Sequence, residues 1–199
     1  MLLAIAGCVG SSQEPRPSPG SRGPRASEHI AKAREHEDAA RDSALRADMR
    51  SDATGREPLL VGHARWDTSA EHERAAAHHR SSAAALEAEF EQACGDHAIT
   101  VSPIVRYGMG GSPTANGVIL YLSPQAGPAE RLIADLRCHR AWMMLGPANM
   151  DNCPLDLDGL VLDAYGEDEG FTLTLSVRDP ELVPELQRRA IHDLELGRR

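Results

Sequence analysis

The sequence is poor in aromatic residues and has almost no lysine. Phe, Tyr and Trp make up 4% of its 199 residues, so a core must be built mainly from Leu, Val, Ile and Ala. Lys32 is the only lysine among 21 basic residues, and the formal net charge is −9. A protein that binds nucleic acid needs a basic surface, and this composition does not provide one.

Common catalytic motifs are absent as well. His36-Glu37 and His72-Glu73 are each followed by Ala at the position where the helix of a zinc metalloprotease carries its second histidine. No Cys-x-x-Cys pair occurs, and the glycine-rich stretch 108–112 lacks the Lys-Ser/Thr of a phosphate-binding loop. No nucleophile stands in a recognisable pattern with a base. We therefore expect a protein that is not an enzyme and that needs no cofactor.

The N-terminal apolar run is too short to cross a bilayer. It ends in Ile5-Ala6-Gly7-Cys8, which resembles the lipobox of bacterial lipoproteins. The resemblance implies cleavage before Cys8, lipid on its sulfur and amino group, and a membrane anchor. Residues 1–7 would then be a truncated signal peptide, with the true start upstream. Because residue 9 is not Asp, the resemblance also implies the periplasmic face of the outer membrane.

Two segments of different character follow the lipobox. Residues 8–26 are rich in Ser, Pro and Gly, which predicts a disordered tether behind the lipidated cysteine. Residues 27–97 predict an α-helical hairpin, with one helix over 27–49 and a second over 68–94. Alanine stripes on both helices indicate closely approaching faces. The seam is predicted at Ile30, Ala33, Ala40, Ala44 and Ala47 in the first helix and at Ala76, His79, Ala83, Leu86, Phe90 and Ala93 in the second.

In residues 98–199 the alanine-rich pattern gives way to short β-branched and apolar runs separated by turns, which predicts a ββαββα domain. The expected elements are a strand over 99–107, a hairpin loop over 108–117, a strand over 118–122, a helix over 128–145, strands over 157–165 and 171–177, and a last helix after 179. The two halves resemble each other at one constant offset. Gly117, Leu120, Leu122, Ser123 and His139 recur as Gly170, Leu173, Leu175, Ser176 and His192.

This repeat predicts two ββα halves related by a pseudo-two-fold axis. They would form a four-stranded antiparallel sheet with its helices on one face. The fold class is therefore α+β, and the topology is a circular permutation of a ferredoxin-like fold.

Three cysteines remain if Cys8 carries lipid. An odd number in an oxidising compartment predicts one disulfide and one further thiol. In the predicted topology Cys94 and Cys153 precede opposite edges of the sheet, so they are the least favoured pair. Cys138, in the middle of a helix, could reach either. We favour Cys138 with Cys153, because that pair closes the shorter loop.

The same residues offer an alternative. His79, Cys94, Cys138, His139 and Cys153 carry the nitrogen and sulfur ligands that zinc or copper prefers, although their spacing matches no established site. Against this, His139 lies at the margin of an apolar helix face, where a hydrogen-bonded structural histidine is the commoner outcome. Adjacent residues on a helix also diverge by about 100°, which separates Cys138 from His139.

The order of four motifs is similar to that in a group of lipoproteins from GC-rich Gram-negative bacteria whose activity is not known. The motifs are His78-His79-Arg80, Cys94, Cys138-His139 and Asn152-Cys153-Pro154, over roughly the last two thirds of the chain. We therefore expect a non-enzymatic, membrane-anchored envelope lipoprotein with a binding or structural role, an envelope protein as partner and no nucleic acid. The alternative is a periplasmic lipoprotein that binds zinc or copper through Cys and His.

Overall fold

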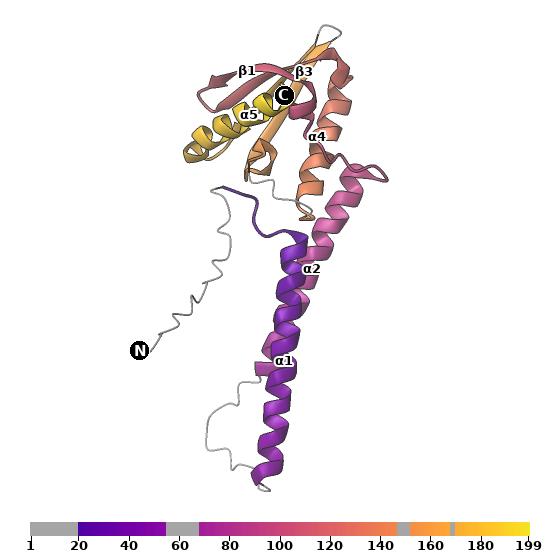
Figure 1. Cartoon of the computed structure of the whole chain (residues 1–199), viewed down its shortest axis with the longest axis vertical. Coiled ribbons are helices and arrows are strands. Elements are labelled where there is room, and N and C mark those ends of the chain that lie inside the picture. Colours follow the sequence, from indigo (N-terminus) through magenta and orange to yellow (C-terminus); the bar gives the residue numbers. More distant parts are fainter. Residues whose placement is uncertain (1–19, 55–67, 147–151, 168–169) are drawn as a thin grey trace, which may run out of the picture.

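The structure, a computed structural model, describes residues 20–54, 68–146, 152–167 and 170–199. The lipobox with Cys8, most of the predicted tether and the segment between the two long helices lie outside these residues. The described chain forms a long helical hairpin with an α+β domain at one end (Figure 1). None of its described helices is long and apolar enough to cross a bilayer.

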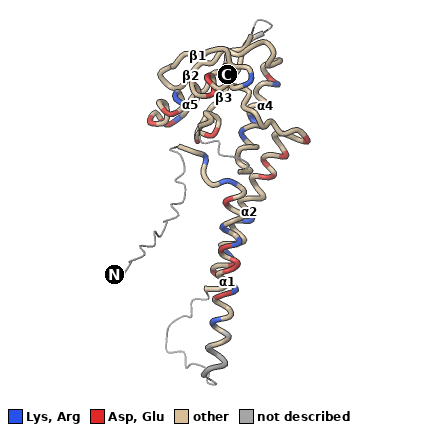
Figure 2. Tube along the Cα trace, viewed as in Figure 1, with Lys and Arg blue, Asp and Glu red and all other residues tan. Residues whose placement is uncertain are grey.

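The hairpin consists of α1 (Ala26–Thr54) and α2 (Thr68–Cys94), in agreement with the two helices predicted from the sequence. With 29 residues, α1 is about 43 Å long at 1.5 Å per residue. Figure 2 shows acidic and basic residues interspersed along both helices. Pairs such as Lys32 and Glu35, 2.9 Å apart, lie on the exposed surface, where an ion pair contributes little stability.

Alanine fills the interface between the two helices. Ala33 and Ala76 are each 2% exposed, so the faces do approach closely, but alanine buries little apolar area. Ala44 and Ala47, predicted to belong to the seam, are exposed. That part of the prediction is wrong because α2 begins beside Ala40, where Ser69 Oγ donates to the Ala40 carbonyl at 3.4 Å. The later residues of α1 extend past the start of α2 and do not pack against it.

The predicted tether ends before residue 26. Residues 20–25 are held against the α+β domain, where the amide of Asp158 donates to the carbonyl of Gly20 at 2.8 Å. The amide of Arg22 donates to the carbonyl of Asp156 at 3.1 Å. The Arg25 guanidinium donates to the carbonyl of Met143 at 2.8 Å. These bonds correct the predicted boundary, because a fixed segment cannot serve as a disordered tether.

A four-stranded antiparallel sheet forms the base of the α+β domain, with spatial order β1-β2-β4-β3. Two helices cover one face (Figure 1). The predicted α+β class and the ββαββα order are confirmed. The elements are β1 (Gly108–Thr114), β2 (Gly117–Leu122), α4 (Ala129–Met143), β3 (Leu160–Glu167), β4 (Gly170–Val177) and α5 (Val183–Gly197), with a short helix α3 (Pro103–Tyr107) and 3-10 turns at Pro124–Ala126, Pro154–Asp156 and Pro180–Leu182.

The predicted pseudo-two-fold axis is visible in the register of the two central strands. Leu120 of β2 pairs with Leu173 of β4, and these residues are counterparts in the internal repeat. Val118 pairs with Leu175 on one side of them, and Leu122 pairs with Phe171 on the other. All these leucines are completely buried. The axis therefore passes between Leu120 and Leu173, and it relates α4 to α5.

The first strand differs from the prediction. The segment 99–107, expected to be a strand, contains α3, and the segment 108–117, expected to be a loop, contains β1. Pro103 explains the first error, because proline favours the first turn of a helix. The residue before a proline also tends to be extended rather than helical, so Ser102 marks where α3 begins.

Close packing explains the second error. A Cβ on Gly111 would lie 2.7 Å from Leu120 Cδ2 and 3.4 Å from Leu194 Cδ1. α5 thus packs on β1 where the strand has no side chain. Pro113 is tolerated because β1 is an edge strand. Glycine and proline, which are typical of loops, here form a strand.

The close approach of β2 and β4 gives a matched test. A Cβ on Gly117 would lie closer than 3.0 Å to the backbone of Leu175, whereas a Cβ on Gly110 would meet nothing within 4 Å. We expect Gly117→Ala to lower the free energy of unfolding by about 2 kcal/mol and Gly110→Ala to change it by less than about 0.5 kcal/mol. Urea denaturation measures both, and equal effects would contradict the described register.

Candidate functional site

Two of the three cysteines beyond Cys8 form a disulfide. Cys94, the last residue of α2, is bonded to Cys138 in α4, with an S–S distance of 2.04 Å and a Cα–Cα distance of 4.8 Å. The predicted pairing of Cys138 with Cys153 is therefore wrong. Helix geometry gives the reason, because neighbouring residues diverge by about 100°. Cys138 faces the end of the hairpin, while His139 faces the inside of the domain, where Cys153 lies buried as a free thiol.

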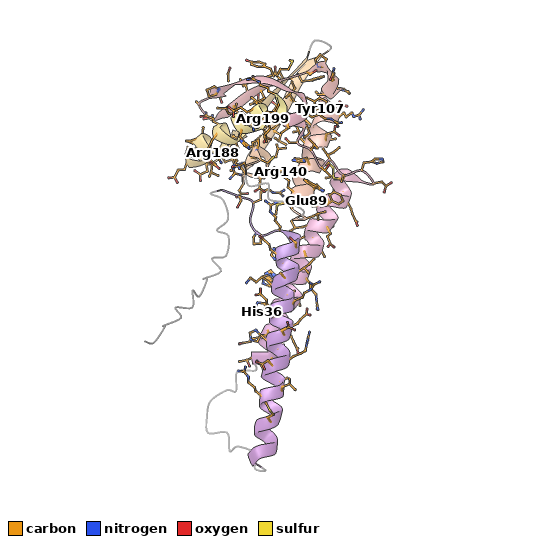
Figure 3. All side chains as sticks on the ribbon, viewed as in Figure 1. His36, Glu89, Tyr107, Arg140, Arg188 and Arg199 are labelled. Atoms are coloured by element: carbon orange, nitrogen blue, oxygen red, sulfur yellow. A yellow bond between two sulfur atoms is a disulfide. The ribbon has the colours of Figure 1, made fainter. Side chains whose placement is uncertain are left out.

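The disulfide joins the hairpin to the α+β domain at a junction that polar contacts also hold. Figure 3 shows Glu89 and Arg140 in this region. Glu89 of α2 accepts a hydrogen bond from Arg22 at 3.0 Å. The Arg22 guanidinium also donates to the carbonyl of Arg140 in α4 at 3.4 Å, so it links the two parts. Because the bonded cysteines are 44 residues apart in the sequence, the loss of chain entropy in the unfolded state stabilises the fold by about 4 kcal/mol.

Cys153 lies beside a histidine on the inner side of the domain. Its sulfur is 3.8 Å from Nε2 of His139. The other ring nitrogen, Nδ1, is 2.7 Å from the carbonyl oxygen of Ile99. A carbonyl only accepts, so Nδ1 carries the proton in the neutral ring and Nε2 faces the thiol as an acceptor. Burial lowers the pKa of His139, partly offset by its bond to Ile99, which favours this neutral form.

An acid and a hydroxyl complete the group. Oδ2 of Asp193 is 3.9 Å from the Cys153 sulfur and accepts a hydrogen bond from Ser102 Oγ at 3.1 Å. Burial raises the pKa of Asp193 to about 6, although the bond from Ser102 opposes the shift. Burial also raises the pKa of the Cys153 thiol, and the nearby Asp193 carboxylate raises it further.

The backbone around Cys153 is held by a buried arginine. Arg189 of α5 is completely buried, and its guanidinium donates to the carbonyl of Cys153 at 3.3 Å. The same side chain pairs with Glu185 at 2.7 Å. The guanidinium thus compensates its own burial through an acid and a carbonyl, and it positions the loop that carries the thiol.

A cavity of about 320 Å³ lies between α3, α4, α5 and the loop at Cys153. Ser102, His139, Cys153, His192 and Asp193 all contribute to its wall. His139 and His192 are counterparts in the internal repeat, so the pseudo-two-fold symmetry brings both into one cavity. The repeat was therefore a sequence signal for this site, although it did not identify Cys153 or Asp193 as neighbours of the histidines.

The arrangement contains a nucleophile and a base that no sequence pattern indicated. A cysteine acts as a nucleophile only as the thiolate, and burial here favours the protonated thiol. His139 is buried, hydrogen-bonded and neutral, as expected for the hydrogen-bonded structural histidine that the sequence predicted. In this state the group is an array of hydrogen-bonding side chains and not an activated catalytic pair.

The predicted metal set does not come together. Cys94 and Cys138 are consumed by the disulfide, and His79 lies on the hairpin against His29. Only His139 and Cys153 meet. Among the residues that the structure describes, no group of three or more His, Cys, Asp or Glu side chains is placed to hold a metal ion. The five-residue zinc or copper site is therefore wrong as a single centre.

Comparison of the chain with protein-family models, with curated proteins and with solved structures finds no match. The resemblance to envelope lipoproteins stays a prediction from the sequence. Function must then be argued from the residues of this chain.

The buried thiol leads to a prediction about its reactivity. We expect iodoacetamide to alkylate Cys153 far more slowly in the folded protein than in urea, because both burial and the raised pKa suppress the thiolate. Asp193→Asn removes the negative charge and should lower the pKa of the thiol, so alkylation should begin at lower pH. A pKa that is lower by one gives roughly tenfold more thiolate at the same pH. Mass spectrometry of alkylation between pH 7 and 10 measures the profile.

Glu195→Gln is the matched control, because it removes the same charge from an exposed position on the same helix. Its profile should coincide with that of the wild type. If the two variants shift the profile equally, the Asp193 carboxylate does not control the thiol.

Proposed function

We propose that the chain is a non-enzymatic envelope lipoprotein whose α+β domain binds a small ligand in the cavity between α3, α4 and α5. The observation that carries the proposal is the convergence of four polar side chains on this cavity, namely Ser102, His139, Cys153 and Asp193. Ligand sites are commonly concave, mostly apolar and equipped with a few polar groups that orient the ligand.

The charges in the cavity indicate which ligands it suits. Among the described residues that line it, Asp193 is acidic and none is Lys or Arg. With a pKa of about 6, Asp193 is largely ionised at neutral pH and would repel an anion. The cavity suits a neutral or cationic ligand that donates a hydrogen bond to Asp193 and places an apolar part against Val105 and Leu196.

The protonated state of Cys153 supports a binding role over a catalytic one. A thiolate nucleophile is normally stabilised by a nearby cation or a helix N-terminus. Here the charges that act on the thiol are the carboxylates of Asp193 and Asp156, which raise its pKa and so have the opposite effect.

One feature of the structure supports the envelope location. A disulfide such as Cys94–Cys138 persists in an exported protein and is rare in the cytoplasm. Residues 20–25 are fixed to the domain, so an anchor at Cys8 would hold the domain within about 40 Å of the membrane even with the chain fully extended. In the proposal, that membrane is the outer membrane, the domain faces the periplasm, and a further envelope protein is the partner.

The anchor is tested by metabolic labelling. When the chain is expressed behind a full-length lipoprotein signal peptide, we expect incorporation of labelled palmitate and recovery in the outer membrane. Cys8→Ala should abolish both, because the lipid is attached to that sulfur. Cys153→Ser is the matched control and should be labelled normally. Equal labelling of the Cys8→Ala variant would contradict the anchor without affecting the cavity.

Ligand binding is tested with pairs of small probes that share a skeleton, in which an amine or alcohol is compared with the corresponding carboxylate. We expect the amines and alcohols to shift the NMR amide signals of His139, Cys153 and Asp193, and the carboxylates to leave them unchanged. Val105→Trp should fill the cavity and abolish the shifts. Val161→Trp, on an exposed position of β3, should preserve them.

Shifts that survive Val105→Trp would place the binding outside the cavity. Carboxylates that bind as well as amines would contradict the role of Asp193.

A further inference from the structure

Four histidines face one another inside the hairpin, away from the cavity. Nδ1 of His29 is 3.0 Å from Nδ1 of His79, and Nδ1 of His36 is 3.2 Å from Nδ1 of His72. Each pair joins α1 to α2, and Figure 3 shows His36 on the hairpin. The rings of His36 and His79 are also stacked, with centroids 5.6 Å apart, so the four imidazoles form a continuous ladder.

The ladder follows the repeat of the hairpin. His29 and His36 are seven residues apart in α1, as His72 and His79 are in α2. In α1, His29 comes three residues after the buried Ala26, and His36 comes three residues after the buried Ala33. Alanine and histidine thus alternate along the seam at the positions that hold apolar side chains in an ordinary helix pair. Leucine there would bury more apolar area, so packing alone does not account for histidine.

The distances suit metal coordination. Two nitrogens bound to one ion at about 2.0–2.1 Å lie about 2.9 Å apart at a right angle and about 3.3 Å apart in a tetrahedron. The two pairs, at 3.0 and 3.2 Å, fall between these limits. In the absence of an ion each pair must share a single proton, because two protonated Nδ1 atoms would repel.

We propose that each of these pairs, His29 with His79 and His36 with His72, binds one divalent transition-metal ion of the zinc or copper class. Each pair supplies two imidazole ligands and water completes the coordination, in keeping with the lack of a three-residue donor group in the described chain. The two ions cross-link an alanine-rich hairpin whose own packing is weak. The site is separate from the cavity and does not depend on its ligand.

The surroundings bear on the charge of the ligands. The pKa of His79 is lowered by desolvation and then by His29, His36, His78 and Lys32, which favours the neutral ring that a metal requires. Glu35 pairs with Lys32 and Glu37 pairs with Arg80, so these two carboxylates are engaged with cations. The proposal therefore assigns the four imidazoles, and not these carboxylates, as the protein ligands of the ions.

The test is a calorimetric titration of the full chain with Zn²⁺ at pH 7.5, with Cys8→Ala in all samples so that the Cys8 thiol cannot compete for the ion. We expect two ions per chain. The double variants His29→Gln/His79→Gln and His36→Gln/His72→Gln should each bind one, and the quadruple variant should bind none. The affinity should fall as the pH is lowered from 7.5 to 5.5, because protons compete with the ion for the imidazole nitrogens.

His97→Gln is the matched control, an exposed histidine outside the hairpin, and should still bind two ions. Nitrogen-15 NMR should show Zn²⁺ moving the Nδ1 signals of the four ladder histidines and leaving those of His97 in place. Helical circular dichroism verifies that the variants remain folded. An unchanged ion count in both double variants, a count that falls in His97→Gln, or no binding at millimolar Zn²⁺ would overturn the proposal.

Discussion

The antiparallel pairing of β2 with β4 is the interaction on which the rest of the domain depends. Leu120 and Leu173 meet at the centre of this ladder, and the two ββα halves are arranged about them. Each half contributes its helix to the same face of the sheet, so α4 and α5 both line the cavity that lies between them. His139 and His192 reach one cavity for this reason. Gly117 is required where the two strands start to pair, since a side chain there would meet Leu175.

The hairpin depends on the domain more than the domain depends on the hairpin. Its interface is built from alanine, which buries little area, whereas helices in proteins gain most of their stability from tertiary packing. The Cys94–Cys138 disulfide fixes its C-terminal end to α4. At the start of α1, the amide of Ala26 donates to the carbonyl of Met144 at 2.8 Å. Both ends of the hairpin that lie near the domain are thus secured, while its far end extends from it (Figure 1).

Burial determines the chemistry of the cavity. The same thiol beside the same histidine would be a reactive pair in an electropositive, partly exposed setting. Here Cys153 is 5% exposed and lies near a carboxylate, so the proton stays on sulfur. The hairpin presents the opposite case, with four imidazoles that are only partly buried and face one another in pairs. The two sites differ in solvent access and call for different ligands.

The sequence by itself determined the elements that local patterns encode. The alanine periodicity predicted the two long helices, and the recurrence of Leu120 as Leu173 predicted the ββα repeat and its four-stranded sheet. These succeed because helix and strand periods are properties of short segments. The position of β1 was missed, because Gly111 belongs to a strand only when Leu194 of α5 lies over it.

Only the tertiary structure decided which side chains meet. Because Cys138 and His139 point in different directions from α4, Cys138 bonds to Cys94 and His139 contacts Cys153. The register of α1 against α2 turned scattered histidines into facing pairs. The raised pKa values of Cys153 and Asp193 follow from burial. Composition and period are local, whereas contacts and burial between residues distant in sequence depend on how the finished elements pack.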